Sequence, residues 1–217
     1  MVSTFRSGRK SLPAEILAFA PKGTEWAILG AGRGRYRFKR YANFDPEPNP
    51  NLAETKIPDA TPGIIAMYAL SDEQALLAKL RYNRLIDVFS GVTCYSLQNH
   101  LRTSVRTVGQ VDTDEVYVGV DRQGAQYVFP VQAKGGRERL RQVQIRQDFA
   151  LCIEKFLNLI CRAIGAQFIG RDLIALFELE ESEERIVIVS ERHYRLVSPS
   201  DISSQELEGY RLRPRAS

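Results

Sequence analysis

The feature that most constrains this chain is the segment 110–134, "QVDTDEVYVGVDRQGAQYVFPVQAK". Two stretches rich in Val, Tyr and Phe flank a three-residue loop at 122–124, which has glycine at its last position. A loop of this length with a left-handed glycine is typical of a β-hairpin. The segment therefore predicts antiparallel strands at 110–121 and 125–134. The apolar run 127–131 further predicts that the second strand is covered on both faces.

The same loop predicts the register of the hairpin. If residues 122–124 form the turn, Asp114 lies opposite Gln132 and Asp112 lies opposite Lys134. These four positions are all even, and strand side chains alternate, so we expect the four side chains on one face. A change of register by one residue would place a neighbour of Asp114 there instead. A lysine at the end of a buried strand needs an anionic partner, which this arrangement supplies.

This set of side chains indicates a metal site. Directly opposed strand residues have Cβ atoms about 5 Å apart, which lets Asp114 and Gln132 share a cation. Carboxylate and amide oxygens are hard ligands that suit Mg²⁺ or Mn²⁺, with Asp112 as an outer or second-metal ligand. Lys134 would orient or help deprotonate an attacking water, or stabilise charge developing on phosphorus.

An acidic residue on one hairpin strand, followed on the next by a residue–x–lysine triplet, resembles the PD-(D/E)xK nuclease superfamily. "VQAK" (131–134) resembles the D…QxK form of its Mrr-like restriction endonuclease branch, with Gln132 where Asp or Glu is usual. The resemblance covers roughly residues 71–165. It implies an α/β (α+β) fold with a restriction-endonuclease-like core, in which a central mixed β-sheet is flanked by helices.

The resemblance also implies a function and a set of roles. The chain would be a Mg²⁺- or Mn²⁺-dependent DNA endonuclease of a restriction or DNA-repair type, with Asp114, Gln132 and Lys134 as its catalytic residues. The superfamily often adds a glutamate from an upstream helix, for which Glu73 and Asp87 are the candidates. Cleavage of both DNA strands would suggest a homodimer. Because a neutral glutamine binds a metal more weakly than a carboxylate, the alternative is a non-catalytic nucleic-acid-binding protein that retains the fold.

Two clusters of basic residues are candidates for DNA contacts. The formal net charge is +4, which permits an anionic partner. The stretch "GAGRGRYRFKR" (30–40) fits either a phosphate-contacting hairpin with Tyr36 and Phe38 packed inward, or a solvated edge strand. A dinucleotide-binding fingerprint needs a helix after its glycines, so the strand-like pattern here disfavours that interpretation. The second cluster contacts DNA or is a solvated helix face. The proposed contacts are Arg33, Arg35, Arg37 and Lys39 in the first cluster and Arg137, Arg139 and Arg141 in the second.

The remaining pattern predicts three regions: a basic β-hairpin and proline-rich connector at 1–63, a nuclease-like core at 64–197 and a tail at 198–217. Expected strands are 25–30, 35–41, 167–180 and 185–191. Expected helices are 71–91, capped by Ser71 and stopped by Gly91, then 95–105 and 140–164, which stops at Gly165, and a short one from Ser200.

Composition narrows the class of protein. No apolar run reaches 18 residues and no signal-peptide stretch follows the basic start, so we expect a cytoplasmic protein without a membrane span. The 3 cysteines argue against a disulfide framework, and Cys152 and Cys161 would lie on opposite sides of one helix. The 2 histidines, His100 and His193, are interpreted as structural. A purely structural interaction protein would be a third class.

Overall fold

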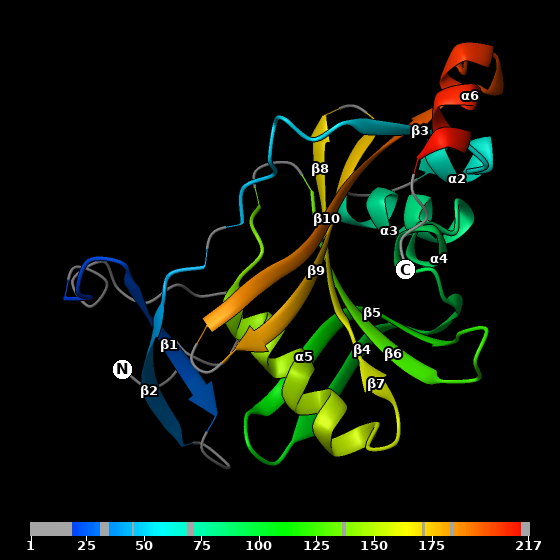
Figure 1. The fold of residues 1–217 in the computed structure, drawn as a ribbon. Helices are drawn as coiled ribbons and strands as arrows, with labels where there is room; N and C mark the ends of the chain where they lie inside the picture. Colours follow the sequence, from blue (N-terminus) through cyan, green and yellow to red (C-terminus); the bar gives the residue numbers. More distant parts are fainter. Residues whose placement is uncertain are drawn as a thin grey trace.

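The computed structural model describes residues 19–30, 35–44, 46–68, 72–135, 138–170, 172–182 and 185–213. They form a curled mixed β-sheet flanked by helices, and a separate two-stranded hairpin (Figure 1). The expected mixed α+β class is thus confirmed. The large sheet has the order β3-β10-β9-β8-β6-β5-β4, with β7 paired to β6. Its strands are β3 (Glu54–Pro58), β4 (Thr93–Val105), β5 (Gly109–Val120), β6 (Gln126–Lys134), β7 (Ile160–Cys161), β8 (Ala163–Gly170), β9 (Leu173–Ser182) and β10 (Arg185–Val197).

Helices cover both faces of this sheet. The helices are α2 (Gly63–Tyr68), α3 (Asp72–Tyr82), α4 (Leu85–Ser90), α5 (Gln142–Lys155) and α6 (Ser204–Leu212). Leu76 and Leu80 of α3 pack in one buried cluster with Phe129 of β6, whereas Cys152 of α5 packs with Val128 on the opposite face. Strand β6 is therefore covered on both sides, as the apolar run 127–131 predicts.

The helix expected at 71–91 is two helices. The chain breaks between α3 and α4 because Arg84 adopts a left-handed conformation with φ of 49°. The side-chain amide of the buried Asn83 holds the break by donating to the carbonyl of Lys79 at 3.0 Å and to Thr61 Oγ1 at 2.9 Å. Gly91, at φ 71°, ends α4 as predicted. The proposed cap, Ser71, lies outside the described residues.

The helix expected at 95–105 is wrong, because this segment is strand β4. It pairs antiparallel with β5 from Thr93–Val120 to Val105–Gly109. A register shift between Ser96 and Gln98 interrupts the alternation that identifies a strand in sequence. The long pairing with β5, not local propensity, decides the conformation.

The helix expected at 140–164 is too long. Helix α5 ends at Lys155, and the apolar stretch after it forms β7 and β8. Gly165 does not stop a helix but lies in β8, where a Cβ atom would come within 2.4 Å of Leu140 Cδ1. Cys161 therefore leaves the helix and packs in the same cluster as Cys152, contrary to the expected opposite sides.

The N-terminal hairpin is confirmed as two antiparallel strands, β1 (Thr24–Gly30) and β2 (Tyr36–Ala42). The turn at 31–34, which contains Arg33, lies outside the described residues. Ala27 and Tyr41 are buried with Val143 of α5, beside which the hairpin lies (Figure 1). The inward packing expected of Tyr36 and Phe38 is wrong, since they are 50% and 53% exposed. Contact with one helix leaves most of a two-stranded sheet uncovered.

The connector and the tail both add to the fold. Within the proline-rich connector, β3 pairs parallel to β10 at one edge of the sheet. In the tail, α6 begins at a capping box formed by Ser203 and Glu206, three residues after the expected start near Ser200. Among the described residues, no helix is both long and apolar enough to cross a membrane.

Candidate metal centre

The β5–β6 hairpin forms with the predicted register. Gly124 closes the loop with φ of 87°, and the strands pair from Val120–Gln126 to Glu115–Val131. Along its other edge, β6 pairs with β8 from Val131 to Lys134. Asp114 and Gln132 therefore lie just beyond the last paired residues of β5 and β6. A side chain can hydrogen-bond to the backbone of the facing strand there, as Asp114 does to Ala133.

Asp114 and Lys134 form the centre of the site. Asp114 Oδ2 accepts from the backbone N–H of Ala133 at 2.8 Å and from Lys134 Nζ at 3.3 Å. The Lys134 side chain is only 8% exposed. A buried ammonium requires a charged partner, and Asp114 supplies it. This contact gives the lysine at the end of the core strand its anionic partner.

Gln132 lies fully buried beside this pair. Its Nε2 donates to the backbone carbonyl of Asp112 at 3.2 Å and to Asp148 Oδ2 at 2.9 Å. Its Oε1 is buried and has no hydrogen-bond partner among the described residues. A buried amide oxygen without a partner is uncommon, so Gln132 presents an unused acceptor at the site.

The expected common face does not include Asp112. Its carboxylate is exposed and pairs with Arg102 at 2.7 Å. The strand alternation breaks at this point, because Thr113 and Val116, three residues apart, both contact the α5 side of the sheet. The even-number rule therefore fails between them. Of the four expected side chains, Asp114 and Lys134 are in contact, whereas Gln132 donates to Asp148 of α5.

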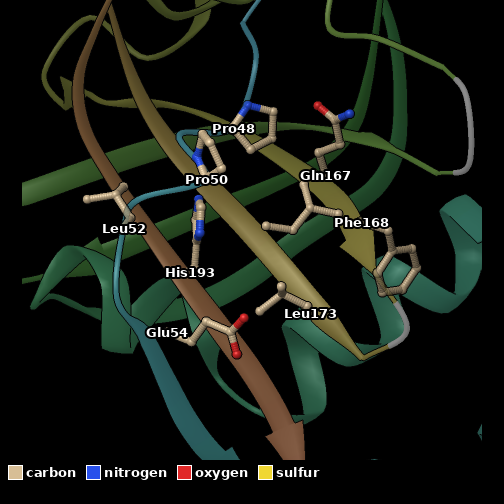
Figure 2. Close-up of a pocket in the computed structure, with 9 residues that line it drawn as sticks. Pro48, Pro50, Leu52, Glu54, Gln167, Phe168, Leu173 and His193 are labelled. Atoms are coloured by element: carbon tan, nitrogen blue, oxygen red, sulfur yellow. The ribbon is translucent and has the colours of Figure 1, made fainter.

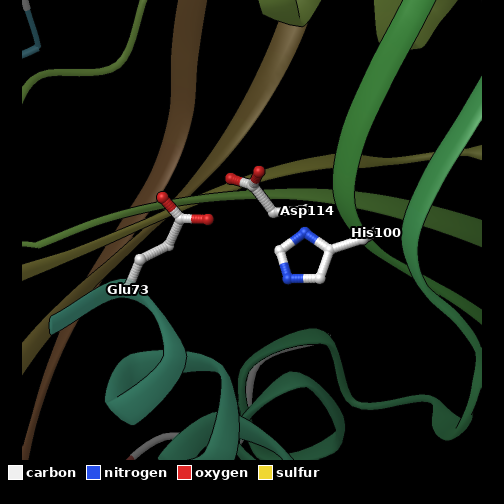
Figure 3. Close-up of side chains that lie close together, drawn as sticks. All are labelled: Glu73, His100 and Asp114. Carbon is white, nitrogen blue, oxygen red and sulfur yellow. The ribbon is translucent and has the colours of Figure 1, made fainter. Parts of the chain in front are cut away.

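Of the two candidates for an upstream helical carboxylate, the structure places Glu73 near Asp114 and Asp87 elsewhere. Glu73, in the first turn of α3, lies with Asp114 and His100 so that one ligand atom from each falls within 4.8 Å of the others (Figure 3). Burial and the negative charge of Asp114 raise the pKa of Glu73. Asp87 is elsewhere, where it accepts from the Arg84 side chain and from the backbone N–H of Cys94. The break at Arg84 accounts for their different surroundings.

His100, which the sequence predicts to be structural, lies in this cluster. The pairs on either side, Asn99–Glu115 and Leu101–Thr113, place it opposite Asp114 across β4 and β5. It is exposed and has a left-handed φ of 48°. Left-handed residues other than glycine concentrate at functional sites. No local signal identifies His100, since its approach to Asp114 depends on β4 being a strand.

Asp148 is the second residue that the sequence did not single out. It is fully buried on α5 and accepts from Thr113 Oγ1 at 2.6 Å and from Gln132 Nε2 at 2.9 Å. Burial raises its pKa to about 7, against the effect of these hydrogen bonds. The available signal was an acidic residue between the buried Ile145 and Cys152 on one helix.

The proposed DNA-contacting residues that the structure describes are exposed or paired with residues outside this cluster. Arg33 and Arg137 fall outside the described residues. Arg35, Arg37 and Lys39 are exposed on or beside β2. Arg37 also donates to the carbonyl of Thr107, and Lys39 Nζ lies 5.0 Å from the centre of the Tyr41 ring. Arg139 pairs with Glu47 at 3.2 Å, and Arg141 is exposed immediately before α5.

A separate hollow of about 410 Å³ lies between the connector and strands β8, β9 and β10 (Figure 2). Its ionisable lining residues are occupied within the chain. Glu54 pairs with Arg195 at 2.5–2.8 Å, and His193 Nε2 lies 2.7 Å from Glu191 Oε1. Gln167 Oε1 on this lining is buried and has no hydrogen-bond partner among the described residues.

Comparisons with known proteins identify no relative: no family model, no curated protein and no solved structure matches this chain.

Proposed function

We propose that the chain is a Mg²⁺- or Mn²⁺-dependent DNA endonuclease with a restriction-endonuclease-like core, similar to the D…QxK branch of the PD-(D/E)xK superfamily. The observation that carries this proposal is the cluster of Asp114 and Lys134 in contact, with Gln132 two residues before Lys134 and Glu73 within 4.8 Å of Asp114. These residues come from three elements, α3, β5 and β6.

The residues fit a hard divalent cation. Glu73 and Asp114 offer carboxylate oxygens and His100 a ring nitrogen, all within 4.8 Å of one another. Gln132 Oε1, which is buried without a partner in the described part of the chain, is the proposed further oxygen ligand. When bound, the ion would supply Lewis acidity toward a phosphate oxygen and toward the attacking water. The raised pKa of Glu73 reflects its burial and the neighbouring negative charge of Asp114, and a cation would neutralise that charge.

Lys134 acts on the substrate side of the cluster. Its ammonium is almost fully buried and held by Asp114, so its position is fixed before substrate binds. A fixed positive charge stabilises the negative charge that develops on the phosphoryl oxygens during hydrolysis. The same group can orient the attacking water through a hydrogen bond.

DNA is the proposed substrate because exposed cations gather on the hairpin next to α5. Arg35, Arg37 and Lys39 give this hairpin the charge that a phosphate backbone attracts. Cytoplasmic location and dimerisation for double-strand cleavage follow from the same proposal. The second candidate is a DNA-binding protein without catalysis, which the neutral Gln132 favours because it weakens metal affinity relative to a carboxylate.

Cleavage of supercoiled plasmid tests the proposal. Purified protein is incubated with methylated and unmethylated plasmid in Mg²⁺, Mn²⁺ or EDTA. Cleavage is expected with either ion and not with EDTA. Asp114→Asn and Lys134→Ala should each lower the rate at least 100-fold, because each removes a group at the reacting centre.

Asp112→Asn is the matched control, since it removes the same charge two residues away, where the carboxylate faces Arg102. It should retain cleavage within about threefold. Absence of cleavage in every context, with DNA still bound, would support the non-catalytic candidate. Equal cleavage by Asp114→Asn and wild-type protein would refute the site.

A further inference from the structure

We propose that Asp148 is a positioning residue that fixes the orientation of the Gln132 amide, so that Gln132 Oε1 is kept available for the cation. This inference rests on the proposed function, and it assigns a role to a residue of α5 that does not itself touch the ion. It also explains how a neutral glutamine can occupy a ligand position.

Both carboxylate oxygens of Asp148 accept hydrogen bonds from residues next to the proposed metal site. Oδ1 accepts from Thr113 Oγ1 at 2.6 Å, and Oδ2 accepts from Gln132 Nε2 at 2.9 Å. Thr113 precedes Asp114 on β5, and Gln132 lies on β6. A single fully buried carboxylate thus ties together the two strands that carry the site.

The contacts of Gln132 Nε2 determine which way the amide faces. The amide nitrogen can only donate and the amide oxygen can only accept. Nε2 meets the Asp148 carboxylate and the backbone carbonyl of Asp112, which are both acceptors in this arrangement. Reversing the amide would place Oε1 against these two acceptors. Oε1 is therefore directed away from Asp148, and it has no partner in the described part of the protein.

The charge of Asp148 also accounts for the residue type at position 132. A carboxylate there would place a second acidic group against the buried Asp148 and would leave the carbonyl of Asp112 without a donor. Two buried like charges in contact are strongly unfavourable. Glutamine satisfies both acceptors and still offers one oxygen, so Gln132 and Asp148 form a matched pair in which the negative charge lies behind the ligand.

Mn²⁺ binding, followed by electron paramagnetic resonance on the full chain, tests the role of Asp148 without relying on catalysis. An asparagine at 148 can present either its oxygen or its nitrogen to Gln132, so Asp148→Asn removes the acceptor-only partner that holds the Gln132 amide in one orientation. Loss of a group that orients a metal ligand typically weakens metal affinity roughly 10- to 100-fold, and we expect a loss in this range. The control is Asp87→Asn, which alters a partly buried aspartate outside the cluster and should change affinity less than about twofold.

The double variant Gln132→Glu/Asp148→Asn provides a rescue. The new amide at 148 can donate to the new carboxylate at 132, whose other oxygen is presented to the ion, while the carbonyl of Asp112 alone is left without its donor. Each single variant should bind Mn²⁺ weakly, whereas the double variant should return to within about fivefold of wild type. Thermal unfolding by circular dichroism identifies the temperature range in which each variant is folded.

The outcomes separate the two proposals. If wild-type protein binds Mn²⁺ and Asp148→Asn binds it equally well, the role of Asp148 is refuted while the metal site stands. A double variant no better than its two single parents would refute the pairing as well. If wild-type protein binds no Mn²⁺, the proposed function fails, and the role of Asp148 fails with it.

Discussion

Glu73→Gln should stabilise the metal-free protein while it abolishes cleavage. Glu73 and Asp114 have carboxylate oxygens within 4.8 Å of each other. Two unit charges at this distance repel by roughly 1 kcal/mol in water and roughly 3 kcal/mol at an effective dielectric constant of 20. The positive charge of Lys134 and the N-terminus of α3 offset part of this repulsion, and partial exposure of Glu73 screens it further.

The raised pKa of Glu73 shows that the remaining electrostatic free energy is unfavourable, since the folded environment disfavours the charged form of this side chain. The penalty is present above the raised pKa of Glu73 and disappears below its ordinary pKa. Replacing the carboxylate by an amide should therefore raise the free energy of unfolding by about 1 kcal/mol at pH 7.5 in EDTA.

Urea unfolding in EDTA and in Mg²⁺ measures this change. A cation that binds only the folded state stabilises it by about 2.7 kcal/mol at 100 times its dissociation constant. Saturating Mg²⁺ should therefore make wild-type protein the more stable of the two. Glu208→Gln, an exposed change on α6, is the control and should have no effect in either condition. A Glu73→Gln protein less stable than wild type in EDTA would refute the proposed surplus of negative charge.

Three further predictions concern packing, pH and DNA. Gly165→Ala should lower the free energy of unfolding by about 1–3 kcal/mol, because its Cβ would meet Leu140, whereas Gly209→Ala, in open space on α6, should raise it by about 0.5–1 kcal/mol in urea titrations. In EDTA, the free energy of unfolding should fall by up to roughly 4 kcal/mol as pH rises from about 4 to 7, because the folded state holds a proton on Asp148 that the unfolded state has lost. Asp148→Asn should abolish this part of the pH dependence. An unchanged pH profile in this variant would contradict the prediction. Changing Arg37 and Lys39 to alanine should weaken DNA binding at every sequence and lower the salt slope by about one for each phosphate that these side chains neutralise, as measured by fluorescence anisotropy.

Local rules were sufficient for the hairpin that carries the site. The three-residue loop and its left-handed glycine determine the register of β5 and β6, and the structure keeps it as far as Glu115 and Val131. The same kind of rule identified strands β1 and β2 and the end of α4 at Gly91. In each case the determining contacts lie within a few residues, so a short stretch of sequence contains the necessary information.

The arrangement of the site depends on contacts that are distant in sequence. The alternation of side chains on β5 breaks near Asp114, where its pairing with β6 ends, and nothing in "VDTDE" marks that point. The carboxylate of Asp112 pairs instead with Arg102, its neighbour across β4 and β5. His100 reaches Asp114 only because β4 pairs along β5, a segment expected to be helical.

The same limit applies to the acidic residues on helices. Glu73 and Asp87 look equivalent in sequence, and only the left-handed turn at Arg84 and the packing of α3 select Glu73. Asp148 could be recognised as a buried acid on α5, but its partners, Thr113 and Gln132, lie 35 and 16 residues away. Buried polar networks of this kind become visible only when the strands and helices are placed together.

The position of a bound Mn²⁺ ion tests the central claim most directly. An anomalous difference map from crystals soaked in Mn²⁺ locates the ion without reference to any assumed ligand. We predict one strong peak within coordination distance of the Asp114 carboxylate and Gln132 Oε1, with Glu73 next to it and Lys134 outside the coordination sphere. A map with no peak at this cluster, or with its strongest peak at other side chains, would contradict the account.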